Sequence, residues 1–156
     1  MFEKAVELLK EKRLKVTFAE SCTGGLMAKS ITDVPGASAV FPGSAVTYSN
    51  EIKIKLTSVK EETIAEHTEV SYACAKEMAK GAAEFFGADI AVSATGYAGP
   101  GGGTDKEPVG TVYVGVYVRG AVCTYRLYYK DKSREEIRQS VCRFAAYMIE
   151  SEAKKL

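Results

Sequence analysis

The sequence predicts a single three-layer α/β/α domain with a mixed, mainly parallel sheet that includes one antiparallel hairpin strand. Three observations lead to this fold class. Helical and strand-like segments alternate along most of the chain, as in sheets with helices on both faces. Two β-rich segments near the end are separated by only Arg119-Gly120-Ala121, which predicts a hairpin. The 156 residues are 46% hydrophobic and 26% charged, which fits one domain over residues 1–156.

Residues 2–12 are predicted to form an amphipathic helix. Their apolar side chains recur at helical spacing, at Phe2, Ala5, Val6, Leu8 and Leu9. A short strand over residues 14–19 follows, and a second helix covers residues 25–32. The cluster Asp33-Val34-Pro35-Gly36 combines two helix breakers and ends that helix. The chain therefore begins with a helix–strand–helix unit.

A short strand over residues 45–48 leads into a third predicted helix. Ser49 or Asn50 can cap this helix. One of its faces carries Ile52, Leu56 and Val59. A fourth helix begins at Ser71 and ends at Gly87, which suits the C′ position. Its apolar stripe comprises Ala75, Met78, Ala79, Ala82 and Phe86.

The C-terminal part is predicted to hold three strands and one helix. The strands cover residues 89–95, 111–118 and 122–129, and the last two form the hairpin. A long glycine-rich loop over residues 96–110 separates the first two of them. Ser133 and Glu136 form a capping box for the last helix. Its core face comprises Ile137, Val141, Phe144, Ala145, Met148 and Ile149.

Composition excludes several classes of partner. With 21 basic and 20 acidic residues the net charge is +1, which gives no electrostatic case for nucleic acid. No apolar run approaches the roughly 20 residues of a membrane span. The four cysteines are far apart and form no CxxC pair, which argues against zinc and disulfides. We therefore expect a soluble cytoplasmic protein with no bound metal and no membrane partner.

Ligands in such sheets usually bind at the carboxyl ends of strands, where residues 20–25, 48–53 and 95–103 are candidates. The first stretch, Ala19-Glu20-Ser21-Cys22-Thr23-Gly24-Gly25, lies where a strand gives way to a helix. Unpaired N–H groups at a helix start favour negative charge. Ser21 could therefore attack a carbonyl while neighbouring amides hold the oxyanion. It could equally be a helix cap in a tight turn.

A serine nucleophile requires a base, and histidine is scarce. His67 is the only histidine and lies in a polar segment, which does not favour a Ser-His-Asp triad or a multi-histidine metal site. A desolvated lysine is then the plausible base, and both Lys53 and Lys55 flank the apolar face of the third helix. Cys22 competes as nucleophile because a helix N-terminus lowers a thiol pKa, although it could simply be a packing residue.

Other side chains could bind a ligand. Thr95 ends a strand beside Gly96, where its hydroxyl could bind substrate or only terminate the strand. The glycine-rich loop allows close approach to a phosphate, or it could be a mobile connector. Arg134 and Arg138 lie one turn apart and could clamp an anion, although a solvated helix face is the ordinary reading.

Three motifs in this order resemble the CinA C-terminal domain family. They are Ala19 to Gly25 above, Val46-Thr47-Tyr48-Ser49-Asn50-Glu51-Ile52-Lys53, and Thr95-Gly96-Tyr97-Ala98-Gly99-Pro100-Gly101-Gly102-Gly103. Pro108-Val109-Gly110 and the arginine pair also fit, so the resemblance covers nearly the whole chain. Tyr97 stands where the family commonly has an aliphatic residue. Longer members carry an additional N-terminal domain, which 156 residues leave no room for.

The resemblance implies an enzyme, a serine-type amidohydrolase that converts nicotinamide mononucleotide to nicotinate mononucleotide and ammonia without a cofactor. By position it makes Ser21 the nucleophile and Lys53, rather than Lys55, its base, with Tyr48 as a nearby polar or stacking residue. It implies a substrate-binding set of Cys22, Thr23, Gly24, Gly25, Thr95, Gly96, Gly101, Gly102, Arg138 and Arg134. Of the two arginines, Arg138 is the first candidate for the anion contact. The glycine-rich loop would suit the substrate phosphate.

Two questions remain open at this stage. The alternative to the enzyme is a non-catalytic nucleotide- or phosphate-binding regulatory module, in which the same loops hold a ligand. The expected partner in both cases is a small molecule, a pyridine mononucleotide. The hairpin or the last helix could also supply a contact for a homo-oligomer.

Overall fold

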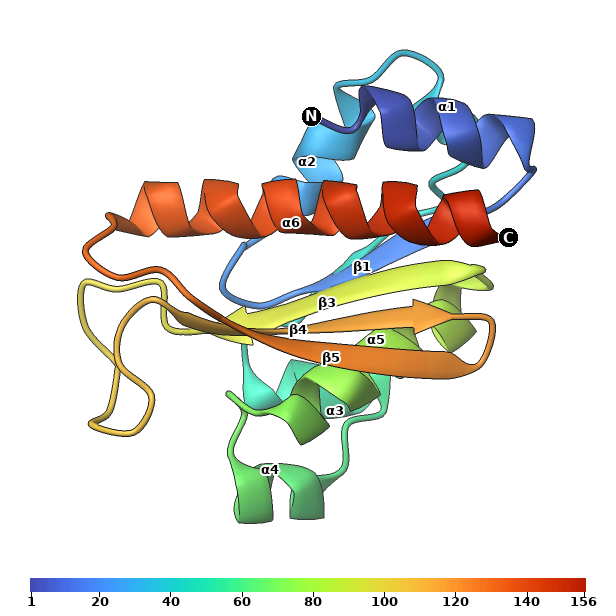
Figure 1. The fold of residues 1–156 in the computed structure, drawn as a ribbon. Coiled ribbons are helices and arrows are strands. Elements are labelled where there is room, and N and C mark those ends of the chain that lie inside the picture. The colour runs from blue at the N-terminus through green and yellow to red at the C-terminus, as the bar shows by residue number, and fades with distance from the viewer.

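A five-stranded mixed sheet forms the centre of the structure, a computed structural model that describes residues 1–156 (Figure 1). The strands lie in the order β2-β1-β3-β4-β5. Their bounds are Val16–Glu20 for β1, Ala45–Val46 for β2, Ile90–Gly96 for β3, Thr111–Val118 for β4 and Ala121–Tyr128 for β5. β1 pairs in parallel with β2 and β3, whereas β4 is antiparallel to both β3 and β5. The predicted mixed sheet with one opposed strand is therefore confirmed.

Helices cover both faces of this sheet and complete the three predicted layers (Figure 1). One layer comprises α1 (Glu3–Glu11), α2 (Leu26–Thr32) and α6 (Arg134–Lys155). The other comprises α3 (Asn50–Thr57), α4 (Glu61–His67) and α5 (Tyr72–Phe86). A short 3-10 helix, η1 (Ala37–Ala39), follows the breaker cluster. The predicted start of α5 at Ser71, its predicted end at Gly87 and the predicted capping box of Ser133 with Glu136 are all confirmed.

The two layers pack on the sheet in different ways. The larger core lies beneath α1, α2 and α6 and includes the aromatic pair Phe2 and Phe18, whose ring centroids are 5.9 Å apart. The smaller core beneath α5 consists mostly of small side chains. Gly81 of α5 brings that helix against α3, since a Cβ atom there would lie 1.8 Å from the Thr57 carbonyl oxygen. This close approach positions α3 directly against α5.

The structure differs from the prediction in the segment between β2 and α5. β2 is only two residues long, and α4 is a helix that the sequence pattern did not indicate. Its seven residues contain one buried side chain, Thr63, so no apolar period marks it. The buried residues of α3 are Lys53 and Thr57 rather than the expected apolar face, and Val59 lies beyond the end of the helix.

The hairpin turn is tighter than predicted. Ala121 already belongs to β5, and the loop is Arg119-Gly120 with φ angles of 42° and 102°. Positive φ at both central positions is typical of a type I′ turn, which matches the twist of the paired strands.

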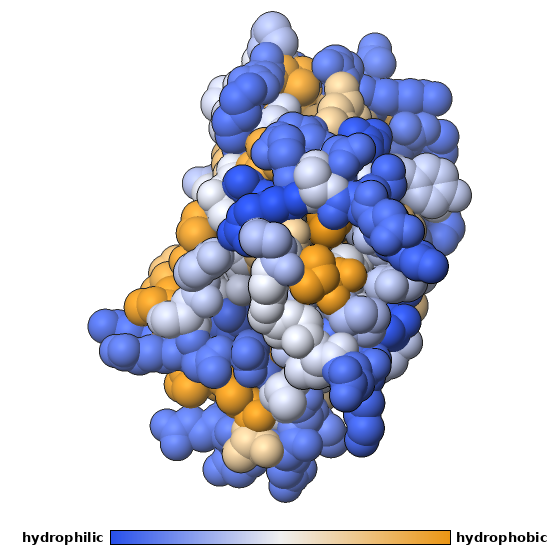
Figure 2. Space-filling view, turned by 90° about the vertical axis from the view of Figure 1, so that its left-hand side faces the viewer, coloured by the Kyte–Doolittle hydropathy of each residue, from blue (hydrophilic) through white to orange (hydrophobic).

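Three further observations concern the surface, the helices and the cysteines. The face toward which the glycine-rich loop projects is mostly hydrophilic, and its hydrophobic patches are separate (Figure 2). None of the helices combines the length and the apolar character needed to cross a bilayer. All four cysteines are free, and only Cys123 is exposed.

Candidate active site

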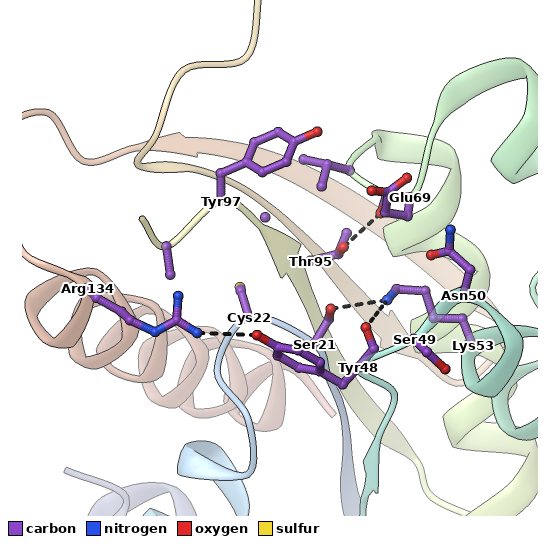
Figure 3. A pocket seen from close by; sticks show the side chains of 13 residues that line it. Ser21, Cys22, Tyr48, Ser49, Asn50, Lys53, Glu69, Thr95, Tyr97 and Arg134 are labelled. Carbon is purple, nitrogen blue, oxygen red and sulfur yellow. Dashed lines mark hydrogen bonds between the residues drawn. The ribbon is translucent and has the colours of Figure 1, made fainter. Parts of the chain in front are cut away.

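A cavity of about 340 Å³ opens at the carboxyl ends of β1, β2 and β3 (Figure 3). The three predicted loops meet there, joined by the segment before α5 and the first turn of α6. Its lining comprises Ser21, Cys22, Tyr48, Ser49, Asn50, Lys53, Glu69, Val70, Thr95, Gly96, Tyr97, Ala98 and Arg134. Parallel strands β1, β2 and β3 end at one edge of the sheet, which is why these distant segments converge.

Glu20, rather than Ser21, caps the helix that follows β1. Its buried carboxylate accepts the backbone N–H groups of Gly25 at 3.0 Å, Met27 at 3.0 Å and Ala28 at 2.8 Å. A carboxylate at a helix N-terminus is stabilised both by these hydrogen bonds and by the helix dipole. The reading of Ser21 as a helix cap is therefore wrong, and its hydroxyl is free for another role.

Lys53 lies one turn into α3, whose N-terminus is capped by the side chain of Ser49. Its Nζ donates to Ser21 Oγ at 3.1 Å, to the Thr47 carbonyl at 2.8 Å and to the Tyr48 carbonyl at 3.4 Å (Figure 3). The side chain is only 1% exposed. Lys55, the other candidate base, is exposed. Of the two lysines, the fold brings only Lys53 to Ser21.

Burial lowers the pKa of Lys53, because the ammonium form loses its hydration. Cys74, Glu69 and Cys22 act on this pKa in the opposite direction. A neutral Lys53 could keep its N–H groups on the two backbone carbonyls and direct its lone pair to the Ser21 hydroxyl. The pair can therefore move a proton from Ser21 to Lys53.

Cys22 lines the same cavity but does not compete as a nucleophile. Burial raises the pKa of its thiol to about 12, so the thiolate is scarce at neutral pH. A buried neutral thiol behaves as a small apolar group. The structure therefore favours the packing alternative for the Cys22 side chain.

Two backbone N–H groups in the turn after β1 have no hydrogen-bond partner. The Ser21 N–H donates to Ala94 O, the Gly24 N–H donates to Ser21 O, and the Gly25 N–H is held by Glu20. No bond involves the N–H groups of Cys22 or Thr23. The Cys22 N–H can therefore donate to a ligand oxygen in the cavity, which Thr23 does not line, whereas the helix N-terminus itself is occupied by Glu20.

The opposite wall of the cavity is built from β3 and the start of α6. Thr95 Oγ1 donates to the Glu69 carbonyl at 2.7 Å, which ties β3 to the segment before α5. Arg134 donates from Nη1 to the Gly99 carbonyl at 2.7 Å and from Nη2 to the Tyr48 hydroxyl at 3.4 Å (Figure 3). Arg134 thus joins two loops and presents its positive charge to the cavity.

Several residues of the predicted binding set lie elsewhere. Arg138 donates Nε and Nη2 to the Thr23 carbonyl, at 3.2 and 2.8 Å, so it supports the turn while Arg134 lines the cavity. The order expected for the two arginines is therefore reversed. Thr23, Gly24 and Gly25 shape the turn without lining the cavity, and Gly101 and Gly102 are exposed farther along their loop.

Sequence reasoning missed Glu69 and Asn50 as lining residues. By sequence Glu69 belongs to a polar segment around His67, and Asn50 is a candidate helix cap within the second family motif. The one signal for Glu69 is its position directly before a helix that packs on the sheet, two residues from the cap at Ser71. That position indicates where the backbone of Glu69 lies, but it does not indicate the direction of its side chain.

The model of one protein family, described as the CinA C-terminal domain, matches residues 1–153. A CinA-like protein from Dictyoglomus turgidum is 52% identical over 118 residues, which are 76% of this chain and 29% of that protein. A CinA-like protein from Leptospira borgpetersenii is 40% identical over 155 residues, 99% of this chain and 37% of that protein. The chain thus spans about a third of the length of these relatives.

Two solved structures share the whole fold. A protein of the competence-damaged protein (CinA) superfamily from Klebsiella pneumoniae is 34% identical, with a TM-score of 0.94 over 99% of this chain and 96% of that chain. A competence/damage inducible protein from Agrobacterium tumefaciens is 39% identical, with a TM-score of 0.89 over 94% of this chain and 93% of that chain.

Proposed function

The chain belongs to the CinA C-terminal domain family, and from this premise and the site geometry we propose that it is a serine amidohydrolase acting on nicotinamide mononucleotide. The observation that carries the proposal is the buried contact of 3.1 Å between Lys53 Nζ and Ser21 Oγ. Acyl transfer requires a nucleophile, a base and donors for an oxyanion, and this cavity offers one candidate for each.

In the first half of the reaction Ser21 Oγ bonds to the carboxamide carbon, and its proton passes to Lys53 Nζ. The N–H group of Cys22 donates to the former carbonyl oxygen and stabilises the negative charge that develops there. The carbon–nitrogen bond then breaks, and the proton on Lys53 moves to the leaving nitrogen, which departs as ammonia. An ester between the substrate acyl group and Ser21 remains.

In the second half a water molecule adds to the ester carbon and gives a proton to Lys53. The bond to Ser21 Oγ breaks, and that oxygen recovers the proton from Lys53. Nicotinate mononucleotide leaves, and the site returns to its starting state. Arg134 is the candidate contact for the phosphate, since it is the cationic side chain besides Lys53 in the lining.

Ammonia release from nicotinamide mononucleotide tests this function directly. Ser21→Ala and Lys53→Met should each lower kcat/KM by roughly a thousandfold or more, because nucleophile and base act as one unit. Lys55→Met is the matched control, since it removes an exposed lysine from the same helix and should retain full activity. Unchanged thermal melting would show that each variant is folded.

Full activity in Ser21→Ala would overturn the proposal. Loss of activity in Cys22→Ala alone would assign the nucleophile to the thiol. Saturable binding of the mononucleotide to the wild-type protein, without ammonia even at high protein concentration, would favour the non-catalytic binding module. The balanced charge of the chain supports a small-molecule ligand over nucleic acid, and retention on DNA in a salt-dependent manner would contradict that expectation.

A further inference from the structure

The cavity has opposite charges at its two ends. Arg134 lies at one end, Glu69 and Asn50 lie at the other, and Ser21 with Lys53 lies between them (Figure 3). Glu69 is the only acidic side chain in the lining. A ligand that crosses Ser21 therefore meets a positive group on one side and a negative group on the other.

The carboxylate of Glu69 has no partner within the protein. It makes no hydrogen bond and no ion pair, although its own backbone carbonyl accepts Thr95 Oγ1 at 2.7 Å. The side chain is half-buried. The backbone of this residue is thus fixed to the end of β3, while its charged group is left for a ligand.

The cations of the cavity are already engaged elsewhere. Lys53 directs its Nζ to Ser21, Thr47 and Tyr48, and it forms no ion pair with Glu69. Arg134 is bonded to the Gly99 carbonyl and to the Tyr48 hydroxyl. No cation of the protein is paired with Glu69, so a cationic group of a bound molecule would be complementary to it.

We propose that Glu69 is a specificity residue that selects substrates whose aromatic ring carries a positive charge. The inference rests on the proposed function, because the pyridinium ring of nicotinamide mononucleotide is such a cation and its phosphate is an anion. The two ends of the substrate then match the two ends of the cavity. The ring of Tyr97 lies on the Glu69 side of the cavity and adds an aromatic surface suited to a cationic ring (Figure 3).

This assignment has a specific chemical consequence. The reduced form, dihydronicotinamide mononucleotide, keeps the carboxamide, the ribose and the phosphate but has an uncharged ring. A carboxylate that recognises ring charge discriminates between the two forms. Because Glu69 is half-buried and partly screened by solvent, the preference should be modest, about five- to tenfold in Kd.

The test measures binding of both mononucleotides by titration calorimetry in the Ser21→Ala background, where the substrate is not consumed. Adding Glu69→Gln should weaken binding of the oxidised form about five- to tenfold and leave the reduced form unchanged. Glu69→Asp keeps the charge and should retain most of the preference. Glu66→Gln is the matched control, since it removes an exposed carboxylate three residues away that does not line the cavity.

Equal weakening of both forms by Glu69→Gln would overturn the proposal and would assign Glu69 to the ribose hydroxyls, which the two molecules share. No change in either affinity would also overturn it. Unchanged affinity for the reduced form shows in the same experiment that the variant is folded. Ammonia release is measured separately on the protein with Ser21 intact, so failure of the amidohydrolase assignment is distinguishable from failure of the role of Glu69.

Discussion

Two glycine-containing segments follow the neighbouring parallel strands β1 and β3, and they serve the site in different ways. In the turn at residues 21–25 the first three residues are buried, while Gly24 is exposed and Gly25 is partly buried, and the turn contributes Ser21 and Cys22 to the cavity. The loop at residues 97–110 is exposed over residues 100–106, and only its first two residues line the cavity. Their glycine content is similar, but their backbone hydrogen bonds are not.

The turn is held from both sides. Glu20 accepts one N–H group of the turn, that of Gly25, and two of the following helix, and Arg138 makes two bonds to the Thr23 carbonyl. In the exposed part of the loop, the ties are the Thr104 N–H to the Glu107 carbonyl and the Glu107 N–H to Thr104 Oγ1. Arg134 bonds to the carbonyl of Gly99, just before this part. A catalytic group must be held within a fraction of an ångström, which the turn can do. The comparison teaches that the hydrogen bonds that tether a segment to the rest of the protein, rather than its glycine content, distinguish the catalytic segment.

Among changes that leave Ser21 and Lys53 in place, the largest effect should come from releasing the turn with Glu20→Gln. An amide has one acceptor oxygen where the carboxylate has two, and its NH₂ group would face backbone donors. Each buried donor left unsatisfied costs about 1–3 kcal/mol, so unfolding in urea should show a loss of about 2–4 kcal/mol. Misplacement of Ser21 should lower ammonia release at least about a hundredfold. Glu7→Gln, an exposed site on α1, is the control and should change neither quantity.

If Glu20→Gln kept full activity, the turn would not depend on its cap, and the two segments would be less different than the structure indicates. A loss of stability without a loss of activity would have the same meaning. The control variant separates these outcomes from a general effect of removing one negative charge.

The second effect concerns the dependence of activity and stability on pH, which follows from the burial of Lys53. Burial lowers the pKa of Lys53, and only its neutral form can accept the Ser21 proton. The value of kcat/KM should therefore rise about tenfold per pH unit below this lowered pKa and level off above it. The folded protein binds fewer protons than the unfolded chain between the lowered and the ordinary lysine pKa, so stability should also rise with pH in that window.

Substitution of Glu69 provides a further test of the pH–rate profile. Glu69 lies before α5, Cys74 on α5 and Cys22 in the turn after β1, and all three raise the pKa of Lys53. Glu69→Gln should therefore move the rise of the pH–rate profile to lower pH, while Glu66→Gln should leave it in place. A profile that is flat across neutral pH would contradict the role of Lys53 as the base, provided that single-turnover kinetics isolate the chemical step.

Much of this fold could be predicted from periodicity, because long helices and buried strands carry repeating apolar patterns. The helix α4 carries none and was missed. The burial of Lys53 could not be derived from α3 alone, since lysines at such positions are usually exposed. It depends on the close contact between Gly81 and the Thr57 carbonyl, which is a property of two packed helices.

In the site, too, local sequence patterns predict some features, whereas others depend on tertiary contacts. The strand ends correctly indicated which loops would meet, because parallel strands end at one edge. By sequence Ser21 is the cap candidate, and only the path of the turn shows that Glu20 takes this role instead. The positions of Arg134 and Arg138 likewise differ by one helical turn, and the contact of Arg138 with Thr23 is a long-range feature.

The smallest effect should come from the exposed loop, through Gly101→Ala. Gly101 has no positive φ, and a Cβ atom there would meet nothing within 4 Å. Its stability should change by less than about 0.5 kcal/mol and its ammonia release by less than about twofold. The matched variant is Gly25→Ala, where φ is 95° and the Cβ atom, 3.6 Å from Val46, has space but the backbone is strained. That variant should lose about 1–3 kcal/mol of stability. A strong loss of activity in Gly101→Ala would show that the exposed loop closes on the substrate, and tethering would then not separate the two segments.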